Sequence, residues 1–295
     1  MNANGPVVVG VDGSASSLAA VETAAREAKL RGTGLRVVHA FIWPAMKVPL
    51  GPAAVGPRDG GLRNLAERTL DEAVTRARDV APGVAVTGEI VTGEPLTVLE
   101  ERSRTASLAV VGSRGMGGFI GLLVGSTAVH LAAHGRCPVL VVRGEPDREG
   151  PVLLAVDGSP EAAGAVEFAF AEASLRGVGL VALHAWNEWT EPGDDDPGHP
   201  QNLVGDAGRL RGTEERVLAE AIAGLREKYP EVGVERRLIR GRVRPALIEA
   251  SEEAQLLVVG ARGRGGFAGL LLGSVSQALL HHAHCPVAVV RSGGE

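Results

Sequence analysis

The chain has little of what would place it in a membrane or outside the cell. Only two of its 295 residues are cysteines, Cys137 and Cys285, so it lacks the disulfide framework of many secreted domains. No stretch reaches the roughly 18 uninterrupted apolar residues of a membrane helix. Residues 1–6 lack the basic start and long apolar run of a signal peptide. We therefore expect a cytoplasmic protein with no membrane partner.

A surplus of basic residues is also lacking. The 30 Lys and Arg residues are outnumbered by 35 Asp and Glu residues, and the formal net charge is −5 at pH 7. General nucleic-acid-binding proteins usually show the opposite balance. We therefore expect no nucleic-acid partner, while a local basic patch beside a phosphate site stays open.

What the chain does contain is a repeat of itself. The segment 6–14 (PVVVGVDGS) recurs at 151–159 (PVLLAVDGS), shifted by 145 residues. The segment 110–126 recurs at 258–274, shifted by 148 residues and with 13 of 17 positions identical. So long a period indicates duplication of a whole domain rather than a solenoid. The sequence predicts one domain at 1–143, a linker at 144–150 and a second domain at 151–295.

Short apolar runs and helical patterns alternate within each repeat. Nearly continuous apolar runs suit strands that are buried on both faces, as in parallel sheets. We expect strands at 7–11, 35–39, 84–91, 108–111 and 138–142, and helices at 14–31, 64–79, 96–104 and from Ser126. In the second copy we expect a helix capped by Ser159, helices at 213–228, 245–253 and from Ser274, and a strand at 232–239.

This order predicts an α/β fold. We expect two tandem, doubly wound, five-stranded parallel-sheet domains of the Rossmann-like kind. In such sheets a ligand binds at the carboxyl ends of the strands, where the strand order switches. The switch falls between the first and fourth strands of each repeat.

A glycine-rich pattern, G-x2-G-x9-G-S, follows the fourth strand in both copies. Glycines permit positive φ and close approach of a phosphate to backbone amides, and free amides at a helix start favour an anion. We predict a phosphate loop, against the alternative that the glycines serve only tight turns. It is not a Walker A loop, because no lysine is near it. The candidate residues are Gly112, Gly115, Gly125 and Ser126 in the first copy, and Gly260, Gly263, Gly273 and Ser274 in the second.

Other polar residues near this edge allow two interpretations each. Asp12 and Asp157 end the first strand of their copies, where a carboxylate can contact a ligand, cap its own helix, or do both. Arg114 and Arg262 lie inside the loops and can neutralise phosphate or simply face solvent. We expect structural rather than catalytic roles for His39 and His184. We expect no metal site at the histidines near Cys285, and we expect the two cysteines to be small buried hydrophobes.

The chain resembles the ATP-binding, tandem-domain branch of the universal stress protein family, whose fold is adenine nucleotide alpha hydrolase-like. The resemblance covers nearly the whole chain and rests on V-D-G-S after the first strand, on the glycine pattern, and on a closing C-P-V-x-V-V strand. It implies that Asp12 and Asp157 lie near adenine or ribose, that the backbones of Ala40 and Ala185 border adenine, and that the loops hold phosphates.

The resemblance also implies a function. We expect a regulator of stress or dormancy physiology that binds one ATP per repeat, with Mg²⁺ open as a companion ion, and that acts on unidentified protein partners. The alternative is a slow ATPase or a nucleotidyl-transfer enzyme, but no catalytic residue is evident. The last strands, 138–142 and 286–290, would pair antiparallel in an intramolecular pseudo-dimer, because exposed apolar edges invite aggregation. Homodimerisation of the chain stays open.

Overall fold

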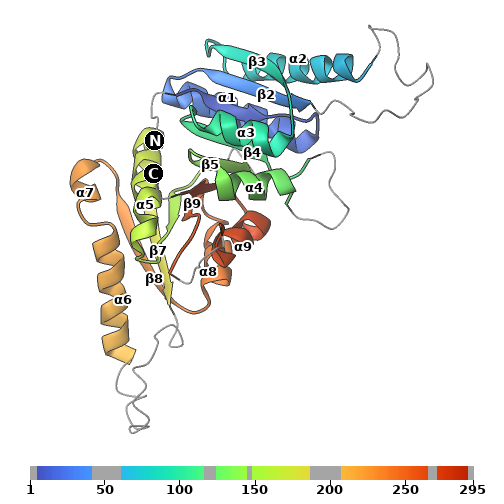
Figure 1. Ribbon diagram of the computed structural model, residues 1–295. Helices are drawn as coiled ribbons and strands as arrows, with labels where there is room; N and C mark the ends of the chain where they lie inside the picture. Colours follow the sequence, from blue (N-terminus) through green and yellow to red (C-terminus); the bar gives the residue numbers. More distant parts are fainter. Residues whose placement is uncertain are drawn as a thin grey trace. The chain divides into compact units, whose positions relative to one another are not determined.

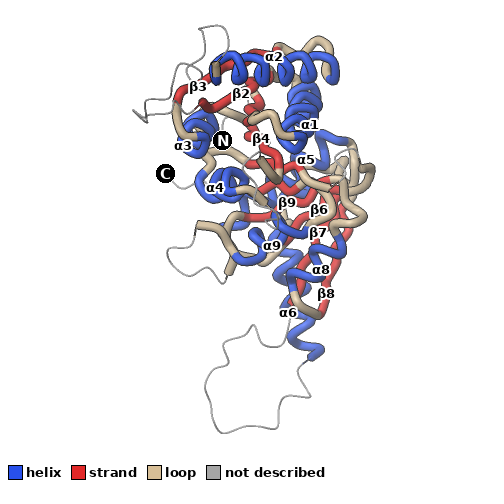
Figure 2. Tube along the Cα trace, turned by 90° about the vertical axis from the view of Figure 1, so that its right-hand side faces the viewer, coloured by secondary structure: helices blue, strands red, loops and turns tan. Residues whose placement is uncertain are grey.

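The computed structural model describes residues 5–41, 61–115, 124–144, 148–186, 207–264 and 271–291. The chain divides into two compact units, Met1–Pro146 and Asp147–Glu295. Strands and helices alternate along both units, as the colours of Figure 2 show. The division falls inside the segment 144–150 that separates the two sequence repeats.

The first unit, drawn in blue to green in Figure 1, is a parallel sheet with helical crossovers. Its strand order is β3-β2-β1-β4-β5, and every pairing among these strands is parallel. Helix α1 contacts α2, and α3 contacts α4. The elements are β1 (Val7–Gly10), α1 (Ala15–Arg31), β2 (Leu35–Phe41), α2 (Leu62–Val80), β3 (Val86–Thr92), α3 (Pro95–Ser103), β4 (Leu108–Gly112), α4 (Ser126–His134) and β5 (Val139–Val142).

The second unit repeats this topology, with order β10-β9-β6-β7-β8 and parallel pairings. The predicted doubly wound fold is therefore confirmed. The elements are β6 (Val152–Ala155), the 3₁₀ turn η1 (Pro160–Ala162), α5 (Ala163–Arg176), β7 (Leu180–Trp186), α6 (Ala207–Ala221), α7 (Leu225–Lys228), β8 (Val234–Arg240), α8 (Val243–Ala250), β9 (Leu256–Gly260), α9 (Ser274–His282) and β10 (Val287–Val290).

The central strands are buried because their side chains are apolar on both faces. Val7, Val8 and Val9 of β1 are at most 1 % exposed, and the strands beside them are similarly covered. Helices α1 and α5 end at Gly32 and Gly177, whose φ angles are 63° and 65°. This left-handed conformation suits glycine, and their amides close the last helical turns.

The second unit departs from the predicted elements in two places. The helix predicted over 213–228 is two helices, because Gly224 takes a φ of 77° and separates α6 from α7. Ser159 is the N-cap residue as predicted, but the helix begins as the 3₁₀ turn η1, and the Ser159 hydroxyl donates to Oδ1 of Asp157 at 2.7 Å instead of accepting from a helix amide. Among the described helices, none is long and apolar enough to cross a membrane.

Candidate functional site

The turn after β1 is organised around Asp12. The Ser14 amide donates to Oδ1 of Asp12 at 2.9 Å, and the Ser14 hydroxyl oxygen accepts from the Ser17 amide at 3.1 Å as the N-cap of α1. Gly13 has a φ of 88°, which the turn requires and glycine adopts readily. This geometry holds the carboxylate at the carboxyl edge of the sheet, beside the start of α1.

The loop after β4 lies directly against this turn. A Cβ on Gly112 would lie 2.6 Å from the carbonyl oxygen of Ser16, and a Cβ on Gly115 would lie 2.6 Å from Oδ2 of Asp12. The Arg114 amide also donates to the Ser16 hydroxyl at 3.2 Å. No larger side chain fits at either glycine without movement. Asp12, Gly112 and Gly115, far apart in sequence, thus form one site at the strand-order switch.

The far end of the glycine pattern returns to the same place. The Gly125 amide donates to the Ser113 carbonyl at 2.8 Å, which joins the two ends of the loop. Helix α4 then begins at Ser126, and neither a side-chain cap nor an acidic first-turn residue neutralises its amides. Such a helix start carries a partial positive charge that favours an anion. Residues 116–123 of the pattern lie outside the described part of the chain.

The second unit rebuilds the site around Asp157. The Ser159 amide donates to Oδ1 of Asp157 at 2.9 Å. A Cβ on Gly263 would overlap Oδ2 of the same carboxylate. The close approach of turn and loop is therefore common to both copies.

The end of the second loop also matches the first. The Gly273 amide donates to the Ala261 carbonyl at 2.7 Å, and α9 begins at Ser274 without a side-chain cap. One difference lies at Gly260, whose Cβ would meet the Arg262 carbonyl oxygen at 3.0 Å rather than the helix start. Residues 265–270 lie outside the described residues.

The second strand of each unit is tied to the first strand by a histidine. Nδ1 of His39 lies 2.8 Å from the Val11 carbonyl oxygen, and Nδ1 of His184 lies 2.7 Å from the Val156 carbonyl oxygen. A carbonyl only accepts, so Nδ1 carries the proton in both rings. These contacts support structural roles for both histidines.

The residues after these histidines are the two alanines predicted to border adenine. Ala40 is half-buried at the end of β2, and Ala185 is buried at the end of β7. Because β2 pairs with β1 and β7 with β6, each alanine lies one strand away from the strand that leads to the aspartate turn.

Three polar residues near the sites were missed by sequence reasoning. Ser16 holds the first loop, Arg264 follows the second loop's Gly263, and Oε2 of Glu214 lies 2.5 Å from Nε2 of His184. Arg264 could have been found from the sequence, because it directly follows Gly263 of the glycine pattern in the run Arg262-Gly263-Arg264. Glu214 gave no signal, since it is one of several carboxylates on an amphipathic helix. Arg114 and Arg262, which were predicted, are both exposed.

The cysteines are buried hydrophobes, as expected. Cys137 and Cys285 are 5 % and 0 % exposed, and both are free thiols. Burial raises the pKa of the Cys137 thiol to about 12, which keeps it protonated at neutral pH. Within the described ranges, no group of three or more His, Cys, Asp or Glu residues is arranged to hold a metal ion.

The fold and site together define a class: a doubly wound α/β protein with a glycine-loop site at its switch point, present twice. The universal stress protein family model matches residues 4–143 and again 150–291. The chain therefore belongs to the universal stress protein family, in its tandem form.

Full-length relatives have the same tandem organisation. The universal stress protein Rv2623 of Mycobacterium tuberculosis is 39 % identical over 298 residues, which cover 97 % of this chain and 96 % of the relative. A universal stress protein of Mycolicibacterium smegmatis is 40 % identical over 293 residues, with the same coverage of both chains. The crystal structure of a universal stress protein from Archaeoglobus fulgidus aligns with a TM-score of 0.67 at 22 % identity, over 97 % of this chain and 98 % of that one, which shows the shared fold.

Proposed function

We propose that this chain is an ATP-binding regulatory protein of stress or dormancy physiology, with one nucleotide per repeat. The observation that carries the proposal is the contact between the aspartate turn and the glycine loop. A Cβ on Gly115 would lie 2.6 Å from Oδ2 of Asp12, and the second unit repeats this approach at Gly263 and Asp157. Because both copies keep this close contact, two nucleotide sites are favoured over one working site and one that has lost binding.

The residues present fit a nucleotide polyphosphate. Backbone amides of the loops and of the starts of α4 and α9 would face the phosphates, with the hydroxyls of Ser126 and Ser274 beside them. Ala40 and Ala185 would border the base, and Arg114 and Arg262 would offset phosphate charge. Mg²⁺ stays open as a companion of the polyphosphate.

The same residues favour retention of the nucleotide over its hydrolysis. Oxygens of Asp157 accept hydrogen bonds from the amides of Ser159 and Arg264, so this carboxylate holds the turn and loop together. Amides and hydroxyls that contact phosphates stabilise the bound ground state as well as the transition state, which does not raise the turnover rate. We expect turnover well below the roughly 1–100 s⁻¹ of kinases.

The test is nucleotide analysis of the native protein. Mass spectrometry of the purified chain should detect co-purifying ATP, and equilibrium dialysis should give a stoichiometry near two by one-site-per-repeat logic. A chain that binds no adenine nucleotide would contradict the proposal. Multiple-turnover hydrolysis at kinase-like rates, lost in Asp12→Ala together with Asp157→Ala without loss of binding, would instead identify an enzyme.

A further inference from the structure

Arg264 joins the two walls of the second site. Its amide donates to Oδ2 of Asp157 at 2.9 Å, so the loop after β9 is fastened to the turn after β6. The guanidinium of Arg264 packs against the same turn. If Gly158 carried a Cβ, that atom would lie 2.7 Å from Nη2 and 3.5 Å from Cζ of Arg264. The cation therefore lies over the turn after β6, at the carboxyl edge of the sheet where doubly wound folds bind ligands.

This guanidinium is available to a ligand. Arg264 is exposed, and among the described residues no carboxylate lies within ion-pair distance of its side chain. Oδ2 of Asp157 accepts its hydrogen bond from the Arg264 backbone amide. A cation that has no counter-ion among the described residues, at a proposed phosphate site, favours an anionic group on the ligand.

The first repeat lacks this cation. At the 148-residue shift that superposes the two glycine patterns, Arg264 corresponds to Met116, whereas Arg262 corresponds to Arg114. The second repeat also carries Glu161 where the first has Ser16 and Glu214 where the first has Ala66, so it gains two acidic residues and one basic residue near the site. Glu161 is exposed on the η1 turn, whereas the Arg264 guanidinium lies against the Gly158 turn.

We propose that Arg264 is a specificity-determining residue that makes the second site select for the phosphate charge of its nucleotide. The inference rests on the proposed function and deepens it. The second site should prefer ATP to adenosine more strongly than the first site does. Its ATP affinity should also fall more steeply with salt, because part of it comes from an exposed charge.

The test measures each site separately in the full chain by calorimetry. Gly115→Ala isolates the second site and Gly263→Ala isolates the first, and ATP and adenosine are titrated over a range of salt. In the Gly115→Ala chain, Arg264→Met should weaken ATP binding about tenfold, as loss of one charge-assisted contact predicts. Adenosine affinity should not change, and the salt dependence should fall to that of the first site. Arg226→Met, at an exposed arginine on α7, is the matched control and should change neither.

The outcomes separate this inference from the proposed function. If the unmodified chain binds no adenine nucleotide, both are wrong. If it binds two ATP molecules but Arg264→Met leaves ATP affinity and salt dependence unchanged, only the role of Arg264 is overturned. An equal loss for ATP and adenosine would show that Arg264 merely shapes the turn, and would also overturn it.

Discussion

The two repeats share the glycine contacts and backbone bonds that shape the loops, and they differ in the charged and polar side chains around them. Both place a glycine against an aspartate carboxylate, and both join the loop ends by an amide-to-carbonyl bond. Around this shared frame, Ser16 is replaced by Glu161 and Ala66 by Glu214 at the repeat shifts. The geometry depends on glycines that no other residue can replace at such distances, whereas the surrounding side chains had room to change.

A second feature shared by the two repeats is a corner where a serine at the end of α3, or just after α8, meets the chain that follows the next helix. The buried hydroxyl of Ser103 accepts from the Arg136 amide at 2.9 Å and donates to the Glu100 carbonyl at 2.5 Å. In the second unit Ser251 accepts from the His284 amide and donates to the Ile248 carbonyl at the same two distances. The buried bonds are retained in both repeats.

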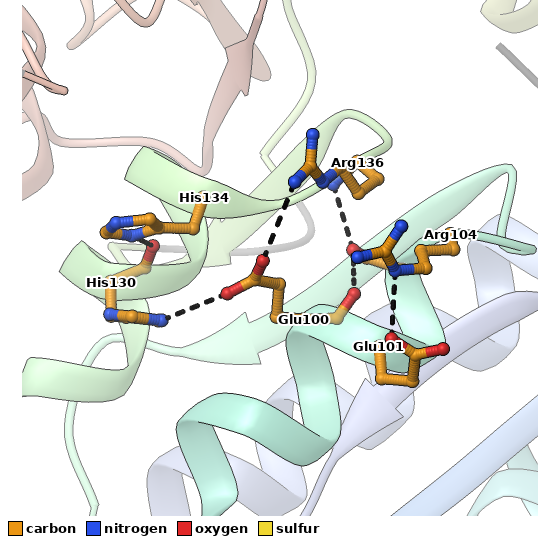
Figure 3. A network of polar contacts seen from close by, with 7 residues as sticks. Glu100, Glu101, Arg104, His130, His134 and Arg136 are labelled. Atoms are coloured by element: carbon orange, nitrogen blue, oxygen red, sulfur yellow. Dashed lines mark hydrogen bonds and ion pairs between the residues drawn. The ribbon is translucent and has the colours of Figure 1, made fainter.

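The charged groups around that corner are not retained. Nε2 of His130 lies 3.5 Å from Oε2 of Glu100, and an oxygen of the same carboxylate lies 4.0 Å from Nη2 of Arg136 (Figure 3). The second repeat has Ile248 in place of Glu100 and pairs His284 with Glu252 instead. Exposed ion pairs contribute little, so their exchange costs little.

The largest effect is expected from substitutions that disrupt the glycine–aspartate contact shared by the two repeats. Gly115→Ala and Gly263→Ala each place a methyl group against an aspartate oxygen, so each should abolish binding at its own site only. Calorimetric stoichiometry should fall from about two to about one for either variant, on the basis of one site per repeat. Gly233→Ala is the control, since a Cβ there meets nothing within 4 Å. Unchanged binding in the double variant would refute the phosphate-loop assignment.

The next effect should appear only in the second unit. Side chains of His184 and Glu214 are 6 % and 12 % exposed, so Glu214→Ala leaves a buried polar ring nitrogen without its partner. We expect a loss of about 1–3 kcal/mol in the free energy of unfolding of that unit, the cost of leaving a buried polar group unsatisfied. Urea denaturation would measure it. Glu215→Ala, at a 55 %-exposed neighbour paired with Arg211, should cost under about 1 kcal/mol. Equal losses for the two variants would contradict the pairing argument.

A smaller effect should be equal in the two units. Ser103→Ala and Ser251→Ala each remove the buried hydroxyl that accepts one part-buried backbone amide, which should cost about 0.5–1.5 kcal/mol of unfolding free energy. Thermal and urea unfolding of both variants would compare the losses. Glu100→Gln, which changes only the charged surroundings, should cost much less. A large loss in one repeat alone would show that the corners are not equivalent.

The smallest effects should differ between the two sites. Ser16→Ala removes the hydroxyl that accepts the Arg114 amide, and should weaken ATP binding at the first site by about 2–10-fold, as expected for one hydrogen bond. Glu161→Ala removes a carboxylate near the second site and should leave ATP affinity there unchanged or improved. Single-site titrations would detect both changes. Weaker binding in Glu161→Ala would mean that this carboxylate supports the site.

Most of the strands and helices could be predicted because the same sequence patterns occur in both repeats. Apolar runs predicted the parallel strands, and Ser126 and Ser274 were correctly predicted to open helices. The break at Gly224 was missed because a lone glycine inside a helical pattern is often tolerated. Ser159 was correctly predicted as an N-cap residue, but its side chain makes no capping bond because the same hydroxyl donates to the neighbouring Asp157.

By itself, the sequence determined the duplication, the order of strands and helices, the family, and which glycines and aspartates are candidates for the site. Those properties follow from local patterning and from comparison of one half of the chain with the other. Only the tertiary structure decided that Gly115 abuts Asp12, that Glu214 reaches His184, and that Arg264 returns over the Gly158 turn. These contacts join residues from different crossovers. Their partners depend on how strands and helices pack at the carboxyl edge of the sheet, and no periodicity along the chain encodes that.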